Sequence, residues 1–174
     1  MNTYFGVHNH TMYSNLRLLD CINRPKDLIN TAKELGLSGI AITDHECLSA
    51  HMEINQLAAK MRETDPNFTI ALGNEIYLTD TRESGQKYYH FILIAKNLMG
   101  WRALRELSSR AWMNSFWDRG MERVVTLKSD LEEIFGENTV TGYAWPFREQ
   151  ECRKAVQHIK DRGYYSILGQ FSNP

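Results

Sequence analysis

Imidazole and carboxylate side chains recur beside apolar segments in the first half of the sequence. His8 and His10 follow a short apolar segment, His45 follows a second, Glu75 lies at the end of a third, and His90 borders a fourth. Side chains two residues apart in an extended chain lie on one face, about 7 Å apart, so His8 and His10 can converge on one or two ions. Imidazole and carboxylate are ligands of zinc, iron and manganese. The pattern predicts a multinuclear metal site.

Each of these residues also has a structural interpretation when it is taken alone. A single histidine beside a strand is more often a hydrogen-bonded core residue than a ligand, and Glu75 could cap a helix. However, five of the six histidines fall within the first 90 residues, and four of those lie at predicted strand edges. Asp20 lies near such an edge as well. We therefore favour the metal site over separate structural roles.

The positions of apolar residues, prolines and glycines predict alternating strands and helices. Pro25 opens the first helix and Gly36 caps it, because proline suits a first helical turn and glycine a helix end. Strands that alternate with helices indicate a parallel α/β sheet or barrel, here in a single domain spanning residues 1–174. The predicted strands are 4–7, 38–43, 68–78, 88–95, 139–144 and 164–168, and the predicted helices are 25–35, 48–61, 100–116, 128–135 and 148–161.

Composition indicates an ordinary globular protein of 174 residues, 43% of them hydrophobic, with a formal net charge of −1. That charge provides no general attraction to nucleic acid. The sequence has no apolar run of about 18 residues and no secretory leader, which predicts no membrane partner. The three cysteines form no CxxC pair, so we expect no disulfide framework and a cytoplasmic location.

Several segments in a fixed order resemble the PHP (polymerase and histidinol phosphatase) family. The closer similarity is to the PHP domain at the amino terminus of bacterial and phage DNA polymerase III alpha subunits. The helix predicted at 100–116 supports this subgroup, because it resembles a helix that standalone phosphatases of the family generally lack. The segments are 5–14 (FGVHNHTMYS), 18–20 (LLD), 32–36 (AKELG), 40–45 (IAITDH), 73–77 (GNEIY), 90–97 (HFILIAKN) and 100–111 (GWRALRELSSRA).

The resemblance implies a distorted (β/α)7 barrel that holds two or three divalent ions (Zn, Mn or Fe) at its mouth. It implies a hydroxide held by the ions as the nucleophile, so no side chain is predicted to be catalytic. Family members linked to polymerases use such a site as a 3′–5′ exonuclease, with the DNA 3′ end and the other polymerase domains as partners. The residues that match the family's ligands are His8, His10, Asp20, His45, Glu75 and His90.

The second half of the sequence departs from the family pattern. The family supplies a cysteine or histidine ligand after the strand predicted at 139–144, where this chain has Trp145-Pro146-Phe147. Cys152 lies in a helical pattern that suggests a buried small side chain, and His158 lies in a charged helix. The chain also ends before the family's later Asp-x-His. We therefore expect a barrel incomplete at its carboxy terminus, as in a fragment of a longer polymerase.

Two other functions stay open on the sequence alone. The missing later ligands favour a catalytically idle scaffold that contacts polymerase subunits, whereas the six early ligands favour an enzyme. A standalone histidinol-phosphatase-like phosphomonoesterase is the third possibility. A stretch of arginines at 102–123 interleaved with tryptophans could bind single-stranded DNA, but nearby acidic residues favour a solvated helix face.

Overall fold

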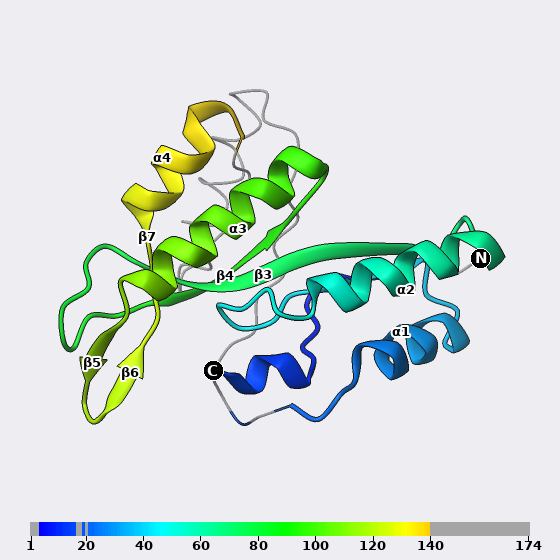
Figure 1. The fold of residues 1–174 in the computed structure, drawn as a ribbon, viewed down its shortest axis with the longest axis horizontal. Coiled ribbons are helices and arrows are strands. Elements are labelled where there is room, and N and C mark those ends of the chain that lie inside the picture. The colour runs from blue at the N-terminus through cyan, green and yellow to red at the C-terminus, as the bar shows by residue number, and fades with distance from the viewer. Residues whose placement is uncertain (1–3, 17–18, 20, 140–174) are drawn as a thin grey trace.

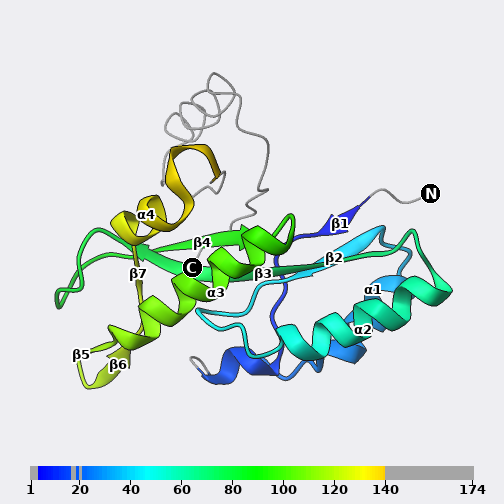
Figure 2. The ribbon, with the colours of Figure 1, turned by 45° about the horizontal axis from the view of Figure 1, so that its top comes forward.

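The computed structural model describes residues 4–16, 19 and 21–139, which form a five-stranded sheet with helices packed on it (Figures 1 and 2). The strands of the sheet are β1 (Phe5–Gly6), β2 (Gly39–Ile42), β3 (Thr69–Thr79), β4 (Tyr89–Ile94) and β7 (Thr126–Leu127). The helices are the 3-10 helix η1 (Met12–Leu16), α1 (Pro25–Glu34), α2 (His51–Thr64), α3 (Leu98–Met113) and α4 (Lys128–Thr139). A separate hairpin joins β5 (Phe116–Asp118) to β6 (Met121–Arg123).

The sheet is mostly parallel, as the sequence predicts. β1 pairs with β2, β2 with the first part of β3, and β7 with the last residues of β3, all in parallel. β4 is the exception, because it pairs antiparallel with β3. A parallel connection needs a dozen or more residues, whereas only residues 80–88 link these two strands. The amino-terminal end of β4 therefore lies beside the carboxyl end of β3.

Side-chain alternation along β3 separates the core from the opposite face of the sheet. Ile76 and Leu78 point to one face, where they pack with residues of β4, α3 and α4. Glu75 and Tyr77 alternate with them and therefore point to the other face. A second core cluster joins β2 to α1 and α2, which lie side by side in Figure 1; its buried members are Ile29, Ala32, Ile40, Ile42, Ala50, Ile54 and Phe68.

The helices agree with the sequence-based predictions except at their ends. α1 begins at Pro25, and Gly36 follows it with a φ of 73°. α2 begins three residues later than predicted, after a turn at Glu46, which has a φ of 46°, and a second turn at residues 49–50. The β5–β6 hairpin was not predicted; Arg119 and Gly120 form its turn, both with positive φ. The strands and helix predicted beyond residue 139 lie outside the described residues.

Gly39 is required where the first three strands meet. A Cβ atom at this position would clash with the Thr69 carbonyl oxygen and the Phe5 ring. We expect Gly39→Ala to lower the free energy of unfolding by about 1–3 kcal/mol, since the neighbouring strands must move apart. Urea denaturation of both proteins measures this loss.

Gly100 in α3 offers the matched control. A Cβ there meets its nearest atom at 3.5 Å, which is ordinary van der Waals contact. Gly100→Ala is expected to leave stability unchanged or to raise it by up to about 1 kcal/mol, because alanine favours the helix. Equal losses in the two variants would contradict the close packing at Gly39.

Candidate metal centre

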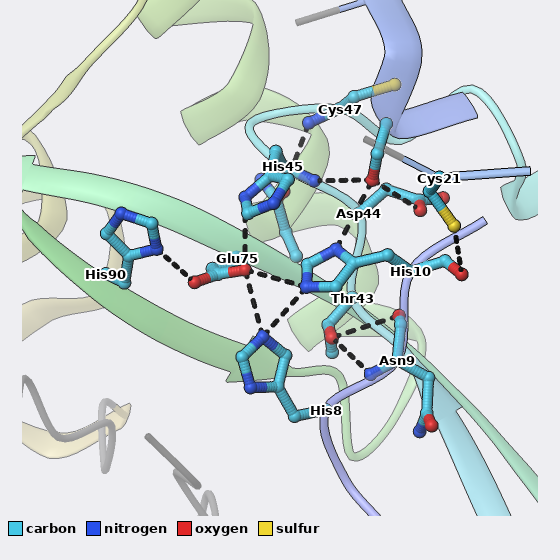
Figure 3. Close-up of polar contacts among 12 residues, drawn as sticks. His8, Asn9, His10, Cys21, Thr43, Asp44, His45, Cys47, Glu75 and His90 are labelled. Atoms are coloured by element: carbon cyan, nitrogen blue, oxygen red, sulfur yellow. Dashed lines mark hydrogen bonds and ion pairs between the residues drawn. The ribbon is translucent and has the colours of Figure 1, made fainter. Parts of the chain in front are cut away.

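The structure brings five predicted ligand residues together at one edge of the sheet (Figure 3). His8 and His10 follow β1, His45 follows β2, Glu75 lies in β3, and His90 lies in β4. The antiparallel β4 still reaches this edge, because His90 is near its amino-terminal end and pairs with Tyr77. The sixth predicted ligand, Asp20, lies outside the described residues.

The carboxylate of Glu75 is the centre of the cluster. One oxygen, Oε2, lies 3.0 Å from Nε2 of His8, 3.0 Å from Nε2 of His10 and 3.1 Å from Nδ1 of His45. The other oxygen, Oε1, lies 2.6 Å from Nδ1 of His90. Glu75 is 0% exposed. A single buried carboxylate therefore faces imidazoles from three other segments of the chain.

Burial and the imidazoles act on Glu75 in opposite directions. Burial alone raises the pKa of the Glu75 carboxyl, because the charged form loses its water. Hydrogen bonds from His10, His45, His8 and His90 outweigh this effect and hold the pKa well below its usual range. Glu75 is consequently a buried anion. Its negative charge favours a cation beside its carboxylate.

The donor atoms fit divalent cations. They form two groups that share Glu75, one with His8 and His10 and the other with His45 and His90, and the ligand atoms of each group lie within 4.8 Å of one another. Two ligands of a tetrahedral zinc ion are about 3.4 Å apart, so the observed separations need only small adjustments. Imidazole nitrogen with carboxylate oxygen suits zinc, iron and manganese.

Asn9 explains why the two histidines of the His-x-His segment point the same way. Its side-chain amide donates to the carbonyl oxygens of Gly6 at 3.1 Å and Ala41 at 3.0 Å. Its backbone carbonyl accepts the Thr43 N–H at 2.8 Å, and its own N–H donates to Thr43 Oγ1 at 3.1 Å. These bonds extend the contact with β2 beyond the end of β1. Because Asn9 is bound to that strand, alternation places its two neighbours toward Glu75.

The backbone around His45 is tied to β3 in a similar way. The Glu75 N–H donates to the Asp44 carbonyl at 3.1 Å, and the Glu46 N–H donates to the Glu75 carbonyl at 2.8 Å. His45 and Glu75 thus form a parallel bridge beyond the end of β2. The side chain of Glu46 accepts the Tyr77 N–H and the hydroxyl of Thr126.

Sequence reasoning missed several residues around the cluster. Tyr77 is 2% exposed, and its ring centroid lies 5.5 Å from that of His45 and 4.7 Å from that of His90. Asp44 is buried beneath the histidines with two hydroxyl residues that follow His10. The available signal was the polar pair Thr11 and Ser14 just after the His-x-His segment.

His51 belongs to the core rather than to the cluster. Its Nε2 lies 2.8 Å from the carbonyl oxygen of Gly73, and its Nδ1 accepts the indole N–H of Trp101 at 3.1 Å. Burial lowers the pKa of His51, so the ring is neutral with its hydrogen on Nε2. Burial likewise raises the pKa of the nearby Cys47 thiol. Neither side chain is part of the two ligand groups.

The contacts of the arginine and tryptophan stretch favour its structural interpretation. The indole of Trp112 donates to the carbonyl oxygen of Glu46, and Arg105 lies over the ring of Trp101 at 4.8 Å. Arg110 pairs with Asp130 at 3.3 Å and with a second acidic residue of α4. These residues join α3 to its neighbours.

A hollow of about 300 Å³ opens beside the cluster. His8 and His10 form one side of it, and Cys21, Asn23 and Leu28 contribute to the rest. Because both histidines are partly exposed, a solute can reach this side of the cluster.

Comparison of the sequence with known proteins identifies the family to which the chain belongs. The chain belongs to the PHP domain family, which it matches over residues 6–144. It is 42% identical over 144 residues to DNA polymerase YorL of Bacillus subtilis, and equally to the DNA-directed DNA polymerase of Bacillus phage SPbeta. It is 32% identical over 170 residues to the DNA polymerase III subunit alpha of Treponema pallidum.

The chain corresponds to a small part of these polymerases. The matches to the Bacillus subtilis and phage SPbeta proteins cover 76% of the chain and 11% of each relative, and the Treponema match covers 94% of the chain and 14% of that relative. A solved structure described as a metal-dependent phosphoesterase from Bifidobacterium adolescentis aligns with a TM-score of 0.43 and 21% identity, covering 64% of this chain and 35% of that one. Among the described residues, no helix has the length and apolarity to cross a membrane.

Proposed function

We propose that the chain is the metal-dependent phosphoesterase domain of a DNA polymerase III alpha-type protein and acts as a 3′–5′ exonuclease on DNA ends. The observation that carries the proposal is the convergence of four imidazoles on one buried carboxylate. The similarity to bacterial and phage DNA polymerases supports DNA as the substrate and the other polymerase domains as partners.

The proposed ligands divide into two groups that share Glu75. His8 and His10 form the first with it, and His45 and His90 form the second. Asp20, outside the described residues, would join them to hold two or three ions of zinc, manganese or iron. Bound ions of this kind lower the pKa of a water ligand toward neutrality and neutralise the charge on phosphate oxygens.

The protein's own residues have separate tasks in this proposal. Glu75 presents one oxygen to three histidines and the other to His90, which suits a carboxylate that serves two ions. The hollow beside His8 and His10 gives the phosphoester a path to the cluster. No side chain is assigned as a nucleophile, because the described carboxylate and imidazoles of the cluster contact one another and are all proposed as ligands.

The direct test is metal-dependent release of nucleotides from a 3′-end-labelled primer. We expect activity with Mn²⁺ or Zn²⁺, and a loss of more than about a hundredfold in His8→Ala and His45→Ala, since each removes a ligand. His51→Asn is the control: it removes a buried imidazole outside the cluster, and its activity should persist.

Three outcomes separate the candidate functions. A wild-type protein that takes up no metal from saturating solutions would refute the proposed metal-dependent enzyme activity. Hydrolysis of histidinol phosphate without hydrolysis of DNA would favour a standalone phosphomonoesterase. Metal uptake with no hydrolysis of either substrate would favour an idle domain.

A contact surface for neighbouring polymerase domains is the second candidate role, because α3 and β5 expose large apolar side chains. Leu98 is 58% exposed, Met99 67%, Met113 85% and Trp117 75%. Apolar surface of this kind is common where protein surfaces meet. It supports a role in contacts with neighbouring polymerase domains, a role that can coexist with hydrolysis.

A further inference from the structure

A buried polar cluster lies beneath the histidines and joins two of the segments that supply them. Thr11 and Ser14 are 0% exposed, and Asp44 is 2% exposed. Asp44 Oδ1 accepts the Thr11 N–H at 2.6 Å and the Ser14 hydroxyl at 2.8 Å, and its Oδ2 accepts the Thr11 hydroxyl at 2.8 Å. Asp44 therefore holds the loop after His10 against the end of β2.

The hydroxyl of Ser14 contacts both of these segments at once. Its oxygen lies 3.2 Å from the backbone nitrogen of His45 and 3.3 Å from Nδ1 of His10. The 3-10 turn does not need this hydroxyl for its own backbone, because the Ser14 N–H already bonds the carbonyl of Thr11 at 2.9 Å. The side chain is thus available for the histidines.

The hydrogen bonds of the Ser14 hydroxyl determine which ring nitrogen of His10 carries a hydrogen. A serine hydroxyl has one hydrogen to donate and two lone pairs to accept with. The hydrogen goes to Asp44, so the two lone pairs face the His45 N–H and Nδ1 of His10. Nδ1 of His10 must therefore carry a hydrogen to complete the contact.

With a hydrogen kept on Nδ1, Nε2 is the nitrogen whose lone pair a metal ion would take in place of the contact with Glu75. This nitrogen lies 3.0 Å from Glu75 Oε2 and 2.8 Å from Nε2 of His8, inside the ligand cluster. In metal sites, the hydrogen bond made by the second ring nitrogen fixes the tautomer and orientation of a histidine ligand.

We propose that Ser14 is a positioning residue of the metal centre. Its hydroxyl, oriented by Asp44, holds His10 as the tautomer that binds through Nε2 and sets the backbone position of His45. This inference rests on the proposed function only in assuming that the cluster binds metal.

The test uses the full chain and Zn²⁺. In the Zn²⁺-loaded wild type, long-range ¹H–¹⁵N spectra should show His10 bound through Nε2, with a slowly exchanging hydrogen on Nδ1. Ser14→Ala should bind Zn²⁺ about 10–100-fold more weakly, as measured by competition with a chromophoric chelator. In this variant the hydrogen on Nδ1 of His10 should exchange rapidly with solvent. Tyr13→Phe is the matched control: it removes a neighbouring hydroxyl, whose partner is Glu53 on α2, and should change neither property.

The outcomes distinguish this proposal from the metal site itself. Wild-type protein that binds no Zn²⁺ would refute the proposed function. Wild-type protein that binds Zn²⁺ with His10 coordinated through Nδ1 would overturn the role of Ser14, even if Ser14→Ala failed to fold. Equal Zn²⁺ affinity in folded Ser14→Ala and wild type would overturn it as well.

Discussion

Glu75→Gln should abolish metal binding and lower the proposed phosphoesterase activity by about a thousandfold, which corresponds to about 4 kcal/mol. Glu75 is the only residue shared by the two ligand groups of the described chain. An amide of the same shape has one acceptor oxygen and no charge, so it can serve neither group as the carboxylate does. The four imidazoles would then face one another without an anion between them. Metal content and primer hydrolysis measure the two effects.

Glu46→Gln is the matched control for this substitution. Glu46 is also a glutamate with 0% exposure, but its carboxylate accepts from Tyr77 N–H and from Thr126, and it belongs to neither ligand group. We expect this variant to lose stability while keeping its metal content. If both variants lose metal to the same degree, the loss follows from general damage to the core, and the central role of Glu75 is wrong.

Removal of metal should destabilise the domain strongly. A ligand that binds only the folded state at 100 times its Kd adds about 2.7 kcal/mol, which corresponds to a rise in Tm of about 5–10 °C for a domain of this size. The donors come from four separate segments, so the unfolded chain offers no comparable site. Thermal unfolding with Mn²⁺ or Zn²⁺, followed by addition of EDTA, measures the rise and its reversal.

Thermal unfolding with a different cation tests whether the rise in Tm is specific to the proposed site. Ca²⁺ prefers oxygen ligands and six to eight of them, whereas this cluster offers mainly imidazole nitrogen. Ca²⁺ at equal concentration should therefore raise Tm much less. A similar rise with Ca²⁺, or an undiminished rise in Glu75→Gln, would indicate general binding of cations to acidic surface and would contradict the site.

The sequence predicted the sheet edge well because the signals there are local. A buried apolar strand followed by a polar residue defines an edge, and parallel strands bring such edges together. This reasoning placed His8, His10, His45 and Glu75 at one edge, and the structure brings them together. His90 lies near the amino-terminal end of its strand, and it reaches this edge because β4 runs antiparallel to β3.

What the sequence did not predict depends on contacts between distant segments. The hydrogen bonds of Ser14 to Asp44 and His45 join residues about thirty positions apart. Hydrophobic periodicity in the sequence does not indicate such pairs. The β5–β6 hairpin was missed for another reason, since its strands have only three residues each. The order of the segments in the family pattern, rather than periodicity, assigned Asp20 as a ligand.

The antiparallel pairing of β3 with β4 also affects how the centre assembles. Glu75 and His90 are only 15 positions apart and meet across a hairpin, whereas His8 is 67 positions from Glu75. Contacts between nearby residues form sooner during folding, because less chain entropy is lost in closing a short loop. The anion and its first imidazole can thus be in place before the amino-terminal strand docks. His8 and His10, although they precede Glu75 in the sequence, would then be the last to complete the centre.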